Sequence, residues 1–350
     1  MSEKLAVGID LGGTNIKAAL VDCQGRVVTA KSCPTEAERG PDPVIDNIVA
    51  LATVLSDDAG RLHREIAGTG VGAPGPMNLA TGTIVRSANL PGWDKVLLRD
   101  RLRDRLHCRV TLENDANAAA YGESWVGAGR GGRDFALLTL GTGVGGGVIL
   151  NGKILHGHFD NAAELGHIIV APNGLQCPCG QRGCLEQYAS AGAVARRVID
   201  AIRAASGSER SAASPLAGDE IGTATVMERS VRTRSASDWP ISTASGSEPI
   251  DSKLVAERAA KGDPLCRRVW DEACFYLALA CITIQHAYNP AVVALGGGMS
   301  EAGNILLDPV RRHLHEQRWS LHDDVPGVVL AELGSDAGVI GAARLAFDAP

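Results

Sequence analysis

Two polar residues, Asn114 and Asp115, lie where the apolar run CRVTL gives way to the alanine-rich segment ANAAA. The junction between a strand end and a helix start is where α/β proteins present ligands. A carboxylate there can accept the proton of an attacking hydroxyl group, and an amide can hold a neighbouring hydroxyl with both its donor and its acceptor atoms. Asp115 can equally be the N-cap that accepts the first N–H groups of the helix. The residues alone give these two interpretations equal weight.

Three further polar residues flank a group of cysteines. Glu164 and His167 belong to the segment AELGH, and Glu186 belongs to GCLEQ. One such residue alone would more often be a surface residue or a satisfied core residue. Together they suit a hexose, because every hydroxyl group taken from water must be hydrogen-bonded again. We therefore predict a sugar pocket beside the cysteines.

The cysteine group CPCGQRGC and the histidine before it have the composition of a metal site. One imidazole and three thiols fall within a short segment, at His167, Cys177, Cys179 and Cys184. This set suits tetrahedral Zn²⁺ with no position left for water, which is typical of a structural metal. We predict that the zinc fixes the loop with Glu164 and Glu186 and orients His167 toward the sugar. A redox-active or merely buried cysteine cluster is the alternative.

Glycine-rich turns follow apolar runs at three places, in DLGGTN, GTGVGGG and GGGM. In the first, Gly12 and Gly13 lack the side chains that would keep the backbone away from a phosphate, and Thr14 and nearby N–H groups can donate to its oxygens. Asp10 can hold Mg²⁺ directly or through water. A single turn of this kind also suits a plain hairpin bend, but three favour a nucleotide held between two lobes. Because neither a P-loop nor a clean dinucleotide fingerprint occurs, the turns favour ATP over NAD.

The first glycine turn is expected within an antiparallel meander. Its three short strands are predicted over Leu5–Asp10, Asn15–Asp22 and Arg26–Lys31, where β-branched and apolar residues are punctuated by turns. The segment DFALLTLGTGVGGGVILNGKIL repeats the same order of strand, glycine turn, strand, short polar turn and strand. An internally duplicated chain predicts two similar α/β lobes that face one cleft.

Other elements complete the two lobes. Helices are predicted near Asp42–Leu55, from about Asp115, from about Glu186 and over about Leu265–Ala287. The apolar segments GTGVGAPG and AVVALGGGMS are predicted to be strands. The stretch Ser206–Ser247 differs, because it is rich in Ser, Thr, Ala and Gly and lacks an apolar period. There we expect a flexible surface loop without a catalytic role.

Composition narrows the class of protein. With 350 residues, of which 45% are hydrophobic, the chain is long enough for two cores. The formal charge of −6 offers no basic footprint for nucleic acid or an anionic membrane. The N-terminal segment MSEKLAVGID does not resemble a secretory leader, and the apolar runs are shorter than the roughly 20 residues of a membrane-spanning helix. We expect a cytoplasmic protein that handles small molecules and has no nucleic-acid or membrane partner.

The motifs DLGGTN, GAPGP, ENDANAAA, TLGTGVGGG, AELGH, CPCGQRGCLEQYAS and LGGGMS follow one another along the chain. With them the sequence resembles the ROK family of bacterial sugar kinases and sugar-responsive repressors over nearly its whole length, apart from the Ser/Thr-rich insertion. The resemblance implies an α/β, two-lobed, actin-like ATPase (ribonuclease H-like) fold with duplicated lobes around a cleft. It implies a smaller lobe from residues 1–117 plus about 336–350, and a larger lobe from residues 118–335 with the zinc motif and the insertion at 206–247.

The resemblance also implies roles for individual residues, with Asp115 as the catalytic base and Asp10 facing Mg²⁺. The residues implied to bind the sugar are Gly75, Asn89, Asn114, Asp115, Glu164, His167 and Glu186. The residues implied to bind ATP and its metal ion are Asp10, Gly12, Gly13, Thr14, Gly141, Thr142, Gly143 and Gly297. The ligands implied for structural Zn²⁺ are His167, Cys177, Cys179 and Cys184. Since no motif residue is missing, the resemblance implies an active enzyme.

The segments ANLPGW, ENDANAAA and TLGTGVGGGVILNGKI look most like the glucokinases of the family, which implies glucose phosphorylated at its 6-hydroxyl. Kinases for N-acetylmannosamine, N-acetylglucosamine and fructose are the alternatives. A repressor would need a DNA-binding motif ahead of the first phosphate turn, which begins at Asp10. A non-catalytic sugar sensor would be expected to lack Asp115 or a glycine turn. The resemblance also implies a homodimer.

Overall fold

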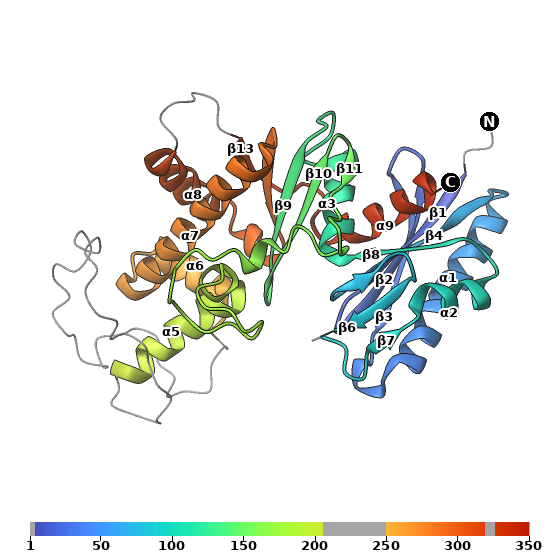
Figure 1. Cartoon of the computed structure of the whole chain (residues 1–350), viewed down its shortest axis with the longest axis horizontal. Helices are drawn as coiled ribbons and strands as arrows, with labels where there is room; N and C mark the ends of the chain where they lie inside the picture. The colour runs from blue at the N-terminus through green and yellow to red at the C-terminus, as the bar shows by residue number, and fades with distance from the viewer. Residues whose placement is uncertain (1–3, 88, 206–249, 319–325, 350) are drawn as a thin grey trace.

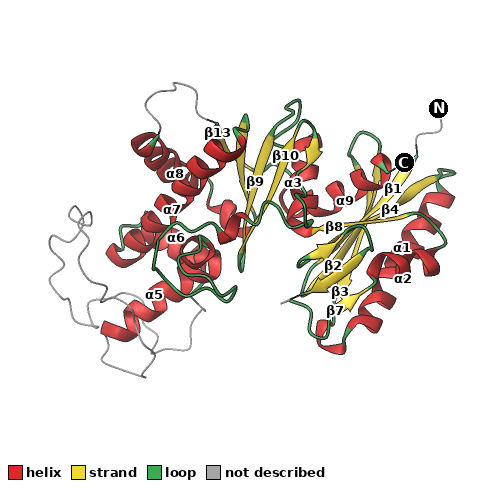
Figure 2. Cartoon of the chain, viewed as in Figure 1, coloured by secondary structure: helices red, strands yellow, loops and turns green. Residues whose placement is uncertain are grey.

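The computed structural model describes residues 4–87, 89–205, 250–318 and 326–349. The predicted loop over Ser206–Ser247 falls outside the described residues. The described elements form two lobes, each built around its own sheet, with further helices packed on the outside (Figures 1 and 2). This α/β organisation agrees with the fold expected from the sequence.

The sheet of the first lobe has the order β3-β2-β1-β4-β8. Its strands are β1 (Leu5–Leu11), β2 (Asn15–Asp22), β3 (Val27–Pro34), β4 (Ile66–Ala73) and β8 (Val110–Asn114). β1, β2 and β3 pair antiparallel, as the meander predicted, whereas β4 pairs parallel with both β1 and β8. The two parallel strands place their carboxyl ends at the same edge of the sheet as β1, and that edge carries Asp10 and Asn114.

The sheet of the second lobe has the order β11-β10-β9-β12-β13. Its strands are β9 (Phe135–Leu140), β10 (Val144–Leu150), β11 (Lys153–Ile154), β12 (Val292–Gly296) and β13 (Gly327–Leu330). Again the first three strands, β9, β10 and β11, pair antiparallel. β12 pairs parallel with both β9 and β13. The same strand order and the same directions in both sheets confirm the internal duplication that the repeated glycine segment predicted.

Helices cover the outer faces of both sheets. In the first lobe these are α1 (Pro41–Arg61) and α2 (Leu98–Leu106), beside a small sheet of β5 (Met77–Asn78), β6 (Thr83–Arg86) and β7 (Asp94–Val96). In the second lobe they are α4 (Glu186–Ala189), α5 (Ala191–Ala205), α6 (Ser252–Ala260), α7 (Pro264–Tyr288) and α8 (Asn304–Gln317). None of the helices that the structure describes combines the length and the apolarity needed to cross a membrane.

Two helices lie between the sheets, α3 (Asp115–Val126) and the C-terminal α9 (Ala337–Asp348) (Figure 1). The alternation of β1 explains one side of this layer. Leu5, Val7 and Ile9 belong to the core under α1, whereas Ala6 belongs to the core with α9. Small residues on the α9 side permit close packing, since a Cβ on Gly70 would lie 1.7 Å from the Ala342 carbonyl oxygen.

The C-terminal helix α9 packs on β1 and β4 of the first lobe. The lobe boundaries at residues 117/118 and about 336 stay predictions.

A buried carboxylate ties this central layer to the second lobe. Glu123 near the end of α3 is fully buried, and it accepts hydrogen bonds from the backbone N–H groups of Ala128 (2.8 Å), Glu332 (3.1 Å) and Leu333 (2.7 Å). Replacing it with leucine would leave these donors without the carboxylate, and each unsatisfied buried donor costs about 1–3 kcal/mol.

We expect Glu123→Leu to lower the free energy of unfolding by about 3 kcal/mol or more. Glu123→Gln keeps the shape and one acceptor oxygen, and should lose less. Denaturant unfolding of both variants, beside Ser124→Ala from the same helix, measures the difference. Equal stability of Glu123→Leu and the parent protein would show that these hydrogen bonds contribute little.

Candidate active site

Two cavities meet at the start of α3. The smaller, of about 260 Å³, is lined by Asp10 from the end of β1, by the first turn of α9 and by residues after β12 and β13. The larger, of about 480 Å³, lies toward the cysteine-containing segment. Asp115, Ala116, Thr139 and Gly297 line both cavities. A group held in one cavity can therefore reach a group held in the other at Asp115.

Backbone conformation distinguishes the two residues at the start of α3. Asn114 has extended dihedral angles (φ −63°, ψ 144°) and is the N-cap, and its Oδ1 accepts the N–H groups of Ala116 (2.9 Å) and Asn117 (3.2 Å). Asp115 is the first residue of the helix, and its Oδ1 accepts the Ala116 N–H (2.8 Å). The N-cap alternative for Asp115 is thus wrong. The Asn114 oxygen is engaged in capping, which leaves the amide group as its donor toward a ligand.

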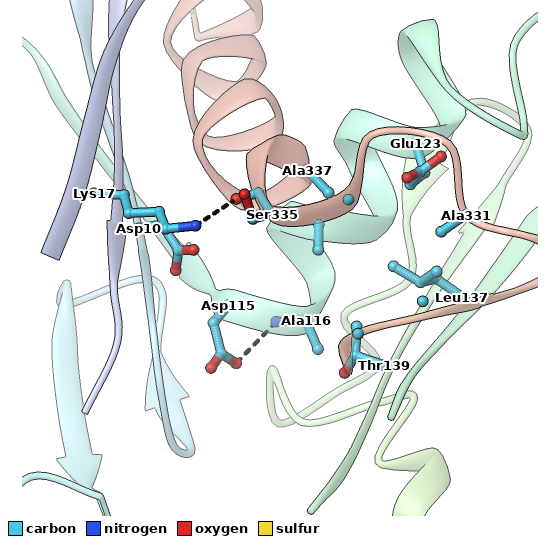
Figure 3. Close-up of a pocket in the computed structure, with 15 residues that line it drawn as sticks. Asp10, Lys17, Asp115, Ala116, Glu123, Leu137, Thr139, Ala331, Ser335 and Ala337 are labelled. Carbon is cyan, nitrogen blue, oxygen red and sulfur yellow. Dashed lines mark hydrogen bonds between the residues drawn. The ribbon is translucent and has the colours of Figure 1, made fainter. Parts of the chain in front are cut away.

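Two of the three carboxyl groups that line the smaller cavity, those of Asp10 and Asp115, lie on the same side of it (Figure 3). Burial raises the pKa of Asp115, and hydrogen bonds from the Ala116 N–H and the Asn114 side chain oppose this rise. Burial and the charge of Asp115 raise the pKa of Asp10 to about 6, against the effect of Lys17. Lys17 itself donates from Nζ to the Ser335 carbonyl oxygen (3.3 Å). A cation between the two carboxyl groups would relieve their mutual repulsion.

The larger cavity contains all the residues expected to bind the sugar. They are Gly75, Asn89, Asn114, Asp115, Glu164, His167 and Glu186. The segments that supply them are far apart along the chain, since Gly75 follows β4, Asn89 precedes β7, and Glu186 begins α4. Their roles in binding stay predictions, but the fold brings them to one polar cavity of a size suited to a small ligand.

The polar residues of this cavity that escaped the sequence analysis include Ser87, Asp160 and Asn161. The Ser87 hydroxyl is buried and has no hydrogen-bond partner within the described residues, so it is available to a ligand. Asp160 is part of the loop that precedes AELGH, and its Oδ2 accepts the Leu79 N–H of the other lobe (3.0 Å). The adjacent polar pair in HFDNA was the only sequence signal for this loop, and nothing in the sequence marked Ser87.

The carboxylate of Glu186 lies against the second glycine turn. Its Oε2 accepts the Val144 N–H (3.0 Å), and a Cβ on Gly143 would lie 2.2 Å from that oxygen. Glycine is needed at this position because any side chain would displace the carboxylate. Glu164 lines the same cavity. Burial raises the pKa of Glu164, the nearby His167 lowers it, and the charges of Asp115 and Glu186 raise it further. Several carboxyl groups thus share one pocket.

The residues expected to bind ATP do not all line the same cavity. Asp10 lines the smaller cavity and Gly297 lines both. Gly141, Thr142 and Gly143 line the larger one. The turn of Gly12, Gly13 and Thr14 lies on neither wall, and Gly13 instead approaches the backbone of Asn89. The contacts of these residues with a nucleotide stay predictions.

The four residues of the expected zinc site lie together. The ligand atoms of His167, Cys177, Cys179 and Cys184 are all within 4.8 Å of one another. The Cys179 and Cys184 sulfurs are 3.7 Å apart, and the Cys177 sulfur lies 3.8 Å from Nδ1 of His167. A tetrahedral zinc with Zn–S bonds of about 2.3 Å places its ligands roughly 3.5–3.8 Å apart. The residues therefore fit Zn²⁺, and coordination through Nδ1 would leave the other ring nitrogen of His167, which lines the larger cavity, without the metal.

Neighbouring residues hold this cluster in place. Gln187 donates from Nε2 to the Cys177 sulfur (3.6 Å) and accepts a hydrogen bond from Arg196 (3.1 Å). The Tyr188 hydroxyl accepts the Leu175 N–H (2.7 Å) at the start of the cysteine loop. Polar groups of this kind orient the ligands of metal sites. Burial raises the pKa of the Cys184 thiol to about 12, so a bound cation would be needed to keep it deprotonated.

The duplicated sheets, the central helices and the paired cavities define a two-lobed protein of the actin-like ATPase fold. The sequence model described as "ROK family" matches residues 6–349. The chain belongs to the ROK family, as the motifs predicted.

Proteins of known name are similar to this chain over nearly its whole length. A glucokinase of Halalkalibacterium halodurans is 35% identical over 342 residues, which cover 97% of this chain and 94% of the relative. The crystal structure of a ROK family glucokinase from Streptomyces griseus, in complex with glucose and AMPPNP, is 30% identical with a TM-score of 0.74 and covers 99% and 100% of the two chains. A ROK hexokinase from Thermus thermophilus is 30% identical with a TM-score of 0.75 and 98% coverage of each chain.

Proposed function

We propose that this protein is an ATP-dependent hexose kinase, and that it phosphorylates glucose at the 6-hydroxyl. The observation that carries the proposal is the meeting of two cavities at Asp115, a half-buried carboxylate that lines both. Transfer of a phosphoryl group needs the acceptor and the donor to meet in line, beside a group that can take the proton of the acceptor. The similarity to the glucokinases named above supports glucose as the acceptor.

In the proposed reaction the sugar occupies the larger cavity and the triphosphate of ATP approaches from the smaller one. Asp115 accepts the proton of the 6-hydroxyl as its oxygen forms a bond to the γ-phosphorus, while the bond from this phosphorus to the bridging oxygen breaks and ADP leaves. Mg²⁺, when bound, would neutralise phosphate charge, and Asp10, which lines the smaller cavity, would hold it. The raised pKa of Asp115 makes the carboxylate a stronger base.

The hydroxyl groups of the sugar need partners on all sides of the larger cavity. Glu164 and Glu186 offer acceptors, the Asn114 amide offers a donor, and the imidazole of His167 lines the same cavity. The proposed structural zinc would hold His167 and the segment before Glu186, so that both keep a fixed distance to the sugar. A homodimer is also part of the proposal, and it rests on the resemblance alone. Light scattering should then give twice the monomer mass.

Release of ADP from ATP·Mg²⁺ with glucose, N-acetylglucosamine, N-acetylmannosamine, fructose and mannose tests the function. We expect glucose to give the highest kcat/KM. A preference for an N-acetyl sugar or fructose would keep the mechanism and replace the substrate. No rate with any of these sugars, combined with sugar binding in calorimetry, would instead indicate a non-catalytic sensor.

A further inference from the structure

A further buried carboxylate, that of Glu113, lies next to Asn114 and Asp115 in the sequence. Glu113, the residue before Asn114 in β8, is only 2% exposed. Its Oε1 accepts the Asn114 N–H (2.9 Å) and the Asn117 Nδ2 (3.0 Å). Both donors belong to the strand end and helix start that carry Asp115. The position of Glu113 therefore affects the segment that presents the catalytic carboxylate.

The other oxygen of this carboxylate pairs with a histidine from the second lobe. Nε2 of His156 lies 2.6 Å from Oε2 of Glu113, although 43 residues separate them in sequence. His156 follows the short strand β11, in the loop that leads to Glu164. Its backbone carbonyl oxygen accepts the Ala162 N–H (3.0 Å), which fixes the turn between them. The pair of Glu113 and His156 thus joins the loop after β11 in the second lobe to strand β8 in the first lobe.

A carboxylate this deeply buried is unfavourable unless a cation or several donors compensate its charge. Removing the charge of His156 would leave the buried Glu113 carboxylate, two residues before Asp115, without its cationic partner. Glu113 would then turn toward water or take up a proton, and either change would loosen its hydrogen bonds to Asn114 and Asn117. Displacement of a catalytic group by about 1 Å can reduce turnover by about a hundredfold.

We propose that His156 is a positioning residue for phosphoryl transfer: its imidazolium balances the charge of Glu113 and thereby holds the strand end that carries Asn114 and Asp115. The proposal rests on the proposed kinase function, because the property it explains is the placement of the base. His156 need not touch the sugar or the nucleotide.

The direction of the pH dependence follows from the groups around His156. The hydrogen bond to Glu113 raises the pKa of His156 above its ordinary 6.5, burial opposes this, and the charges of Glu113 and Asp160 raise it further. The pair therefore contributes fully below pH 6.5, and its contribution is lost as the pH rises through the raised value. Turnover should fall on the alkaline side for this reason.

Steady-state kinetics of three variants between acid and alkaline pH test the role. His156→Gln should lower kcat by about tenfold to a hundredfold with little change in sugar affinity. His156→Arg, or His156→Lys if the larger guanidinium does not fit, keeps a permanent charge and should retain turnover while the alkaline loss disappears. His158→Gln, from the same loop, is the matched control and should behave like the parent protein.

A double-mutant cycle examines the pair itself. If His156 acts through Glu113, the double variant Glu113→Gln/His156→Gln should lose less kcat than the product of the two single losses. Thermal unfolding of every variant shows whether a loss reflects folding. Normal kcat in His156→Gln, an alkaline limb that persists in both cationic variants, or independent losses in the cycle would overturn the proposal.

An NMR titration of the His156 ring protons separates this proposal from the proposed function. The midpoint should fall when Glu113 is replaced by glutamine, whether or not any sugar is phosphorylated. An unchanged midpoint would contradict the pair even in an active kinase. Conversely, an inactive protein with a shifted midpoint would refute the kinase function and leave the ion pair intact.

Discussion

Replacing Asp115 with asparagine should lower kcat by about 10²–10⁴ while the sugar still binds with nearly its normal affinity. The asparagine side chain has the same shape and keeps an oxygen for the Ala116 N–H, but it cannot take a proton from the sugar hydroxyl. Asp115→Ala should be at least as inactive. Phosphorylation is measured as ADP release, and sugar binding by calorimetry.

The pH dependence of the parent enzyme should follow from the same residue. Burial raises the pKa of Asp115, so turnover should increase as the pH rises through that value and the carboxylate forms. The sign for stability is opposite, because the folded protein holds the proton more tightly than the unfolded chain and loses stability as the pH rises through this range. Asp115→Asn should therefore unfold at a higher temperature than the parent protein at neutral pH.

Asp57→Asn on α1 is the matched control, since Asp57 is exposed and lies on the outer helix of the first lobe. Near-normal turnover in Asp115→Asn would show that another group accepts the proton. Loss of sugar binding together with turnover would show that the variant disturbs the pocket.

Removing the proposed structural zinc should have the second large effect, on stability and on sugar binding. We expect Cys177→Ser to abolish stoichiometric zinc, lower the unfolding temperature and raise the KM for the sugar more than it lowers kcat. The reason is that structural zinc in small peptides contributes about 10 kcal/mol or more to folding, and here it would hold His167 and the segment that leads to Glu186. Elemental analysis and thermal unfolding report on the site without reference to activity.

Cys23→Ser provides the comparison, because Cys23 is an exposed free thiol outside the cluster. A chelator strong enough to remove zinc should reproduce the effect of Cys177→Ser in the parent protein and leave the zinc-free variant unchanged. Fully active protein without zinc would contradict a structural metal.

Sequence reasoning worked best where a local pattern has a direct physical cause. Alternating apolar residues in β1 and β2 and the glycine after each first strand predicted both meanders, and the repeat predicted the duplication. Gly75 and Asn89 could be assigned to the expected sugar pocket only through the family resemblance. Gly75 and Glu186 line one cavity because the fold brings the end of β4 and the start of α4 together, and spacing along the chain does not encode that distance.

Some decisions depend on backbone angles that a residue type does not determine. Asn114 and Asp115 are both good N-caps, and only the extended conformation of Asn114 makes it the cap and leaves Asp115 to face the cavities. The predicted lobe boundaries depend on neither residue type nor backbone angle alone, and they stay predictions.

The sequence by itself determined the family and the repeated sheet, and it predicted the four metal ligands as a set, because each depends on residue types within a short segment or on ordered motifs. Only the tertiary structure decided which polar groups meet across the cleft. Ser87 and the pair of Glu113 with His156 carry no local signature. Asp160 and His156 contact the first lobe because the loop after β11 crosses to it, and burial there turns Glu113 and His156 into partners that must compensate one another's charge.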